Sequence, residues 1–165
     1  MVFLPPIQAT PPAPRRRSRA FSLVELVIVL CIIALVSAMA IPRYAGATAR
    51  YRLDAAAKRI ATDLALSRQQ AQVTSHTQSV VFQPSAGTYS IAGLPSLDNP
   101  ALGYSVNLGL EPYKATLVSA NFGGAATAAF DCYGAPVAGG TVVVRVGTSQ
   151  KSIVLDTSTG KVTIP

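Results

Sequence analysis

Residues 21–41 read FSLVELVIVLCIIALVSAMAI, and this stretch decides the fold of the 165-residue chain. It contains one charged side chain, Glu25, and neither glycine nor proline. At a rise of about 1.5 Å per residue, such a helix is about 31 Å long and matches the roughly 30 Å hydrocarbon core of a bilayer. The stretch therefore predicts one membrane-spanning helix over residues 21–41.

The segment before this helix, residues 1–20, is proline-rich and positively charged, with no acidic residue, which predicts an extended leader. Its basic residues are Arg15, Arg16, Arg17 and Arg19. Close beyond the helix there is a single basic residue, Arg43. Because basic residues favour the cytoplasmic side, the leader arginines predict the topology: a single pass through a membrane, with the N-terminus in the cytoplasm and the rest of the chain outside.

Three interpretations of residues 21–41 compete. A secretory signal peptide would be cut after Ala38-Met39-Ala40, but the apolar run exceeds the usual length of about 7 to 15 residues, and Pro42 follows close behind. A plain single-pass anchor explains the apolar run but not the placement of Glu25. We favour the third interpretation, in which the chain is cut before the helix and the whole helix stays on the mature protein.

The residues at the start of the helix carry a family resemblance. Arg19-Ala20-Phe21-Ser22-Leu23-Val24-Glu25-Leu26 resembles the type IV prepilin signal. The resemblance implies that prepilin peptidase cuts on the cytoplasmic side, between Ala20 and Phe21, and that Phe21 becomes an N-methylated N-terminus. The family usually has glycine before the cut. Alanine is the next smallest residue, so we expect Ala20 to be accepted, but more slowly.

Glu25 is the candidate assembly residue. A carboxylate inside a bilayer helix costs on the order of 2.5 to 3.5 kcal/mol, so an intramembrane glutamate is a functional candidate. The alternative is that Glu25 lies shallow and snorkels to the headgroups. In the family that the motif resembles, the N-terminal amine of one subunit pairs with this glutamate of the next. The resemblance thus implies an assembly site of Phe21, Glu25 and Leu26, with the ion pair between Phe21 and Glu25.

Beyond the membrane, the helical pattern resumes after Pro42, where the resemblance implies a helix kink. Residues 44–75 are dense in helix formers and contain no proline. Apolar residues recur at helical spacing on one face: Leu53, Ala57, Ile60, Leu64 and Ala71. We predict that this face packs on a globular domain, with a coiled-coil partner as the alternative. Arg52, Arg59 and Asp63 are predicted on the opposite, polar face.

After Gln78 the sequence becomes rich in glycine and in short runs typical of strands. The predicted strands cover residues 79–83, 88–92, 104–108, 116–119, 141–146, 152–156 and 161–164. Gly139-Gly140 and residues 156–160 are predicted turns. The alternation of Val142, Val144 and their neighbours with polar residues predicts an antiparallel sheet with one buried face.

These patterns together predict an α+β fold. The resemblance implies that this fold is pilin-like and that the protein lies in the inner membrane, with its C-terminal domain in the periplasm. A long N-terminal helix, half transmembrane and half amphipathic, packs on a C-terminal antiparallel β-sheet or small β-sandwich. The predicted parts are a cytoplasmic leader (1–20, removed), a transmembrane and filament-core helix (21–41), an amphipathic helix (42–78) and a periplasmic β-rich domain (79–165).

The C-terminal pattern narrows the resemblance. It is similar to that of the H-type minor pseudopilins of type II secretion (GspH) and their FimT-like relatives. The matching motifs are Phe130-Asp131, Gly134, Gly139-Gly140 and residues 141–144, 152–155 and 160–162. The resemblance implies a minor subunit of a periplasmic pseudopilus that supports protein export across the outer membrane. A minor type IV pilin, FimT-like, with a role in pilus assembly or DNA uptake is the alternative.

The resemblance also implies the partners. They are other pseudopilins or pilins in the filament, the prepilin peptidase, the inner-membrane assembly platform and the lipid bilayer. A nucleic-acid partner is disfavoured, because only four dispersed basic residues follow Arg68: Lys114, Arg145, Lys151 and Lys161. The formal charge of +7 belongs mostly to the leader, since the chain that starts at Phe21 has 10 basic and 7 acidic residues, a balance of +3.

Other chemistry is sparse in the sequence. No G-x-S-x-G motif occurs and His76 stands alone near a helix end, so we predict no catalytic residue, no cofactor and no enzyme activity. The acidic residues Asp98, Glu111, Asp131 and Asp156 are scattered, so no metal site is predicted. Cys31 and Cys132 are far apart and should not pair. Cys132 is predicted to be a buried free thiol.

Overall fold

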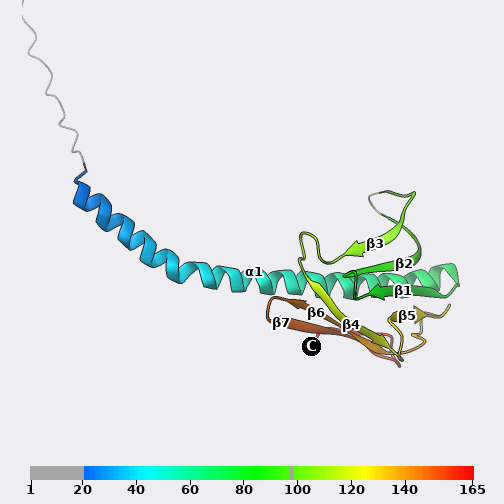
Figure 1. Ribbon diagram of the computed structural model, residues 1–165. Helices are drawn as coiled ribbons and strands as arrows, with labels where there is room; N and C mark the ends of the chain where they lie inside the picture. Colours follow the sequence, from blue (N-terminus) through cyan, green and yellow to red (C-terminus); the bar gives the residue numbers. More distant parts are fainter. Residues whose placement is uncertain (1–20, 97–98) are drawn as a thin grey trace, which may run out of the picture. The chain divides into compact units, whose positions relative to one another are not determined.

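The computed structural model describes residues 21–96 and 99–165, and only the backbone at residues 40–42. The chain divides into two compact units, Met1–Ile41 and Pro42–Pro165. The first unit, as far as it is described, is helical. The second combines a helix with eight strands (Figure 1).

Helix α1 extends over Leu23–Thr74, 52 residues, and its assignment continues through Pro42. It ends where Ser75 takes a φ of +55°, a left-handed conformation that cannot continue the helix. Within the second unit, the predicted apolar face is confirmed. Its buried residues are Leu53, Ala56, Ala57, Ile60, Leu64 and Ala71.

The strands form two four-stranded antiparallel sheets. The first has the order β3-β2-β1-β5, with β1 Gln78–Gln83, β2 Thr88–Pro95, β3 Gly103–Asn107 and β5 Thr127–Phe130. The second has the order β4-β6-β7-β8, with β4 Thr116–Phe122, β6 Gly140–Val146, β7 Ser149–Leu155 and β8 Val162–Thr163. The α+β, pilin-like fold class predicted from the sequence is confirmed, with two sheets beside the helix.

Two local predictions in the β-rich part differ from the structure. Strand β5 was not predicted, because its sequence TAAF holds two alanines, which are poor strand formers. Gly139-Gly140 is not a hairpin turn, because Gly140 begins β6 and pairs with Phe122 of β4. A Cβ on Gly140 would lie 2.1 Å from the Asn121 carbonyl oxygen. Glycine is therefore needed here because the neighbouring strand comes too close for a side chain.

The tight hairpin lies one strand later, at Gly147, where φ is +58° between β6 and β7. The predicted turn at residues 156–160 is confirmed. There the Asp156 carboxylate accepts hydrogen bonds from the backbone N–H groups of Ser158 and Thr159 at 3.0 and 2.7 Å. These bonds, led by that of Thr159, lower the pKa of Asp156 to about 2.

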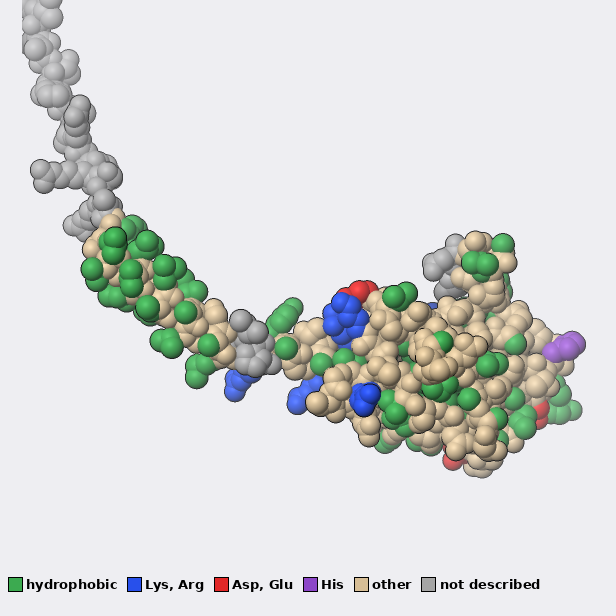
Figure 2. Space-filling view, viewed as in Figure 1, with side chains coloured by type: hydrophobic (Ala, Val, Ile, Leu, Met, Phe, Trp, Pro, Cys, Tyr) green, Lys and Arg blue, Asp and Glu red, His purple; other side chains and the backbone are tan. Residues whose placement is uncertain are grey.

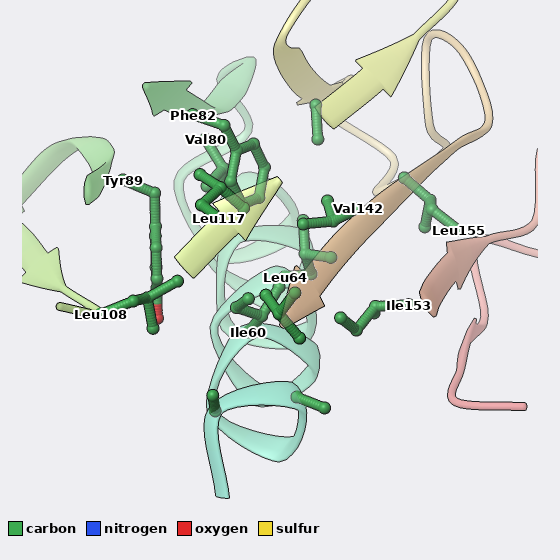
Figure 3. Packing of buried hydrophobic residues seen from close by; sticks show 14 of the residues in the cluster. Ile60, Leu64, Val80, Phe82, Tyr89, Leu108, Leu117, Val142, Ile153 and Leu155 are labelled. Carbon is green, nitrogen blue, oxygen red and sulfur yellow. The ribbon is translucent and has the colours of Figure 1, made fainter. Parts of the chain in front are cut away.

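One hydrophobic core joins the helix to both sheets. Ile60 and Leu64 of α1 lie among side chains from both, including Val80 of β1 and Val142 of β6 (Figure 3). The rings of Phe82 in β1 and Phe122 in β4 stack at 5.7 Å between centroids, which ties the two sheets together. The second unit therefore has its own continuous core.

Candidate assembly site

The first turns of α1 present apolar side chains on every side. Phe21 is 79% exposed and Leu26 is 56% exposed. Of the described side chains between residues 21 and 39, only Ser37 is half-buried, and all the others are exposed. The described residues contain one helix long and apolar enough to cross a membrane, and its most apolar window is not buried at all. A helix that is hydrophobic all round needs lipid or other apolar helices around it.

Glu25 is the one charged side chain in this apolar surface, and it lies in the first turn of α1. A negative charge there is favoured by the helix dipole, by about 0.3 to 1 kcal/mol at an exposed site. Ser22 and Glu25 have the spacing of a capping box, and the Leu26 N–H donates to the Ser22 carbonyl at 3.1 Å. Among the described residues, however, no group donates a hydrogen bond to the Glu25 carboxylate, which leaves it available to a second chain.

A second polar feature lies inside the β-rich unit, and we call it the Asp63 cluster: Arg59, Asp63, Tyr89 and Tyr104. Asp63 is 3% exposed, which corrects the prediction that it lies on the polar face. Its Oδ2 accepts hydrogen bonds from the hydroxyls of Tyr89 and Tyr104 at 2.6 and 2.7 Å and from Arg59 Nε at 3.2 Å. The cluster ties α1 to β2 and β3 through side chains alone.

The cluster changes the ionisation of its tyrosines. Burial raises the pKa of Tyr104 to about 12, and its hydrogen bond to Asp63 acts in the same direction. Burial also raises the pKa of Tyr89, with a further contribution from the charge of Asp63. Both hydroxyls therefore stay protonated and donate to the carboxylate throughout the physiological pH range.

A pocket of about 330 Å³ opens beside the cluster. Arg59 and Tyr104 line it together with Ser105, Asn107 and Tyr113. The Arg59 guanidinium is already balanced by Asp63 at 3.2 Å and lies over the Tyr104 ring at 5.9 Å. The pocket therefore offers mainly neutral hydrogen-bonding groups, and its one charged lining residue, Arg59, serves the packing of the helix on the sheet.

Comparison with known proteins agrees with this division into an apolar helix and a β-rich unit. Residues 15–41 match the prokaryotic N-terminal methylation motif. Two crystal structures of the type IV minor pilin FimU from Pseudomonas aeruginosa, in different space groups, match the fold. One has a TM-score of 0.53 and 15% identity over 70% of this chain and 90% of FimU. The other has a TM-score of 0.50 and 14% identity over 68% and 92%. A search of curated proteins finds no match.

The chain has a pilin-like fold. It joins this fold to a prokaryotic N-terminal methylation motif. The methylation motif and the apolar helix are consistent with an inner-membrane pilin.

The structure describes only some of the site residues that the sequence predicts. Phe21, Glu25 and Leu26 lie together at the start of α1. Ala20 and the leader arginines, Arg15, Arg16, Arg17 and Arg19, lie outside the described residues. The side chain of Pro42 also lies outside them, so the kink there stays a prediction. The predicted pair between Phe21 and Glu25 joins two chains and stays a prediction as well.

The remaining candidate groups have local structural partners. Within residues 21–96 and 99–165 there is no cluster of three His, Cys, Asp or Glu that could hold a metal ion. Asp131 accepts hydrogen bonds from the backbone N–H groups of Tyr133 and Ala135, and Asp98 lies outside the described residues. His76 is exposed just past the end of α1.

Both cysteines are free thiols, as predicted, with Cys31 exposed in the apolar part of α1. Cys132 is half-buried, which corrects the prediction that it is buried. The neighbouring Tyr133 is 82% exposed and lines a pocket together with Cys132.

Proposed function

We propose that the chain is a minor subunit of a pilin-like filament. Residues 21–41 hold it in the inner membrane before assembly and pack into the filament core afterwards. The observation that carries the proposal is the exposed apolar surface at the start of α1, in which Glu25 is the one charged side chain. A core of such helices is about as apolar as lipid tails, so transfer from bilayer to filament sacrifices little hydrophobic free energy.

The ion pair between subunits would favour the transfer of a subunit from the bilayer to the filament and would fix its position relative to the next subunit. The amine of Phe21 in one subunit would pair with Glu25 of the next, in an environment of low dielectric constant where opposite charges attract strongly. The same environment makes an unpaired charge costly, by about 3 to 5 kcal/mol. A subunit therefore enters the core at the position where the two charges meet.

The first test of the proposal is the N-terminus of the membrane form. Intact-mass measurement and N-terminal sequencing should find a methylated chain that begins at Phe21, because prepilin peptidase cuts after Ala20. We expect Ala20→Gly to speed this processing and the bulkier Ala20→Leu to block it. A chain that begins at Ile41 would contradict the proposal and indicate a signal peptide, and an unprocessed Met1 chain would indicate a plain anchor.

We propose type II secretion as the system, with the chain as an H-type minor pseudopilin that supports protein export across the outer membrane. The C-terminal sequence pattern, which includes the β6–β7 hairpin and continues to residues 160–162, supports this assignment. A minor type IV pilin is the second candidate, favoured by the likeness of the fold to FimU. Nucleic-acid binding is not part of the proposal, because Lys114 and Lys151 pair with Glu111 and Asp54, both at 2.6 Å.

A deletion strain distinguishes the two systems. If the chain serves type II secretion, its loss should reduce the export of folded proteins to the medium and leave surface pili unchanged. If it is a minor type IV pilin, its loss should reduce surface pili and leave export unchanged. Each defect should be restored by the wild-type gene, and a strain with neither defect would contradict both assignments.

A further inference from the structure

An exposed face of α1 follows directly after the proposed membrane span. We call it the Arg–Tyr stripe: Arg43, Tyr44, Arg50 and Tyr51. Tyr44 is 78% exposed and Tyr51 is 74% exposed, and both arginines are exposed as well. Aromatic side chains that are exposed together on one face can mark an interaction surface. The stripe thus lies on the part of α1 that belongs to the β-rich unit, and none of the described residues covers it.

The four residues form one face because of their spacing. Arg43 and Arg50, like Tyr44 and Tyr51, are seven residues apart, close to two helical turns and about 10 Å along the axis. Leu53, on the side of α1 that packs against the sheets, is 3% exposed and belongs to the core. Tyr44 and Tyr51 therefore lie opposite Leu53 and point away from the sheets, while Arg43 and Arg50 lie exposed on the flank of the helix between the two sides.

The stripe is also positively charged and without compensation. No acidic residue occurs between residues 43 and 53, and Arg43 and Arg50 form no ion pair within the described part of the chain. Arg52 differs, because it reaches Glu111 at 3.4 Å. In the space-filling view, blue Lys and Arg side chains gather where α1 enters the β-rich unit, and few are visible farther along it (Figure 2).

Chain connectivity limits how far the stripe can lie from the membrane. Tyr44 is the third residue after Ile41, so it lies about 4.5 Å beyond the end of the span in a helix and within about 10 Å of it in any conformation. The headgroup layer on each side of a bilayer is about 5 to 8 Å thick. Arg43 and Tyr44 therefore lie at headgroup level, and Arg50 and Tyr51 reach it when the helix lies along the surface. Amphipathic tyrosine rings and basic side chains are the groups that favour this layer.

We propose that the Arg–Tyr stripe docks on anionic phospholipid headgroups of the leaflet in which the span ends, while the subunit waits for assembly. The inference rests on the proposed membrane span of residues 21–41. Docking lays the β-rich unit on the bilayer surface, and assembly must then release it. Each arginine that reaches an anionic surface shifts the docked-to-undocked ratio by about fivefold, and salt weakens the effect.

The absence of tryptophan from the chain allows a direct test. The full-length protein would carry a single reporter, either Tyr51→Trp in the stripe or Tyr133→Trp, an equally exposed site far along the chain. Each is placed in nanodiscs of phosphatidylcholine or of an equimolar mixture with phosphatidylglycerol, with brominated acyl chains as quencher. We expect emission from Tyr51→Trp to shift to shorter wavelength and to be quenched in the anionic discs, while emission from Tyr133→Trp is unchanged.

Two further variants separate the possible outcomes. Ile32→Trp places the reporter inside the proposed membrane span, and we expect its emission to be quenched in both kinds of disc. Without that quenching, the proposed span and the docking both fail. With it, equal emission of Tyr51→Trp in neutral and anionic discs overturns the docking alone. A shift that follows the number of chains per disc and not the lipid charge would assign the stripe to a second copy, and would also overturn it. Adding Arg43→Gln and Arg50→Gln to Tyr51→Trp should lower the docked-to-undocked ratio by about 25-fold and so remove most of the anionic shift.

Discussion

Glu25→Ala is expected to abolish incorporation of the chain into filaments and to leave its membrane insertion intact. The substitution removes the one charge in the apolar surface, so insertion becomes more favourable, by up to about 3 kcal/mol. In the filament core it leaves the Phe21 amine without a counter-ion, at a cost of about 3 to 5 kcal/mol. That cost corresponds to a drop of about 10² to 10⁴ in incorporation, which immunoblots of sheared filaments and of membranes would measure.

Matched variants distinguish the proposed ion pair from a role of Glu25 in the helix start. Glu25→Gln keeps the size of the side chain but loses its charge, so its incorporation into filaments should fall nearly as far as that of Glu25→Ala. If Glu25 only stabilises the first turn, Glu25→Gln would cost no more than about 1 kcal/mol and would resemble Ser22→Ala. Normal incorporation of Glu25→Gln would therefore overturn the ion pair even where insertion is normal.

The residues at the start of the helix were predictable because their signal is local. Glu25 is isolated in a long apolar run, and its position four residues after Phe21 is visible without any tertiary structure. The apolar face of residues 53–71 was predictable for the same reason, since helical periodicity is a property of neighbouring turns.

Asp63 was not predictable, because its surroundings come from distant parts of the chain. Its spacing of four residues from Arg59 is typical of an exposed helical ion pair. Tyr89 and Tyr104 bury it, and they lie 26 and 41 residues away on two strands. An inward-facing tyrosine on each of two neighbouring strands needs an acceptor for its hydroxyl. That need was the one feature of the sequence that could have indicated a buried acceptor such as Asp63.

The differences in the β-rich part have a similar physical origin. Residues 127–130 form β5 because they pair with β1, which overrides the weak strand preference of alanine. Gly140 was assigned to a turn by composition, but the Asn121 carbonyl next to it requires glycine inside a strand. Local preference identified most strands, and strand pairing decided the rest.

Asp63→Ala is expected to destabilise the β-rich unit by about 3 kcal/mol. The carboxylate is the common acceptor for the Tyr89 and Tyr104 hydroxyls and for Arg59, so its removal leaves two buried donors without a partner. Arg59 is partly exposed, so water can replace the hydrogen bond that it loses. Chemical unfolding of the full chain in detergent, followed by the near-ultraviolet circular dichroism of tyrosine, would measure the change.

Asp54→Ala is the matched control, because Asp54 lies on the same helix and accepts from Lys151 at 2.6 Å but is about half exposed. It should cost no more than about 1 kcal/mol, as surface pairs do. The pH dependence gives a second readout. The pKa of Tyr104 is raised to about 12 in the folded chain, against about 10 when unfolded, so stability should fall as pH rises from about 10 to 12. Asp63→Asn removes the negative charge beside both hydroxyls and should make that fall shallower. Equal costs for Asp63→Ala and Asp54→Ala, with an unchanged alkaline slope in Asp63→Asn, would show that the cluster does not hold the helix on the sheet.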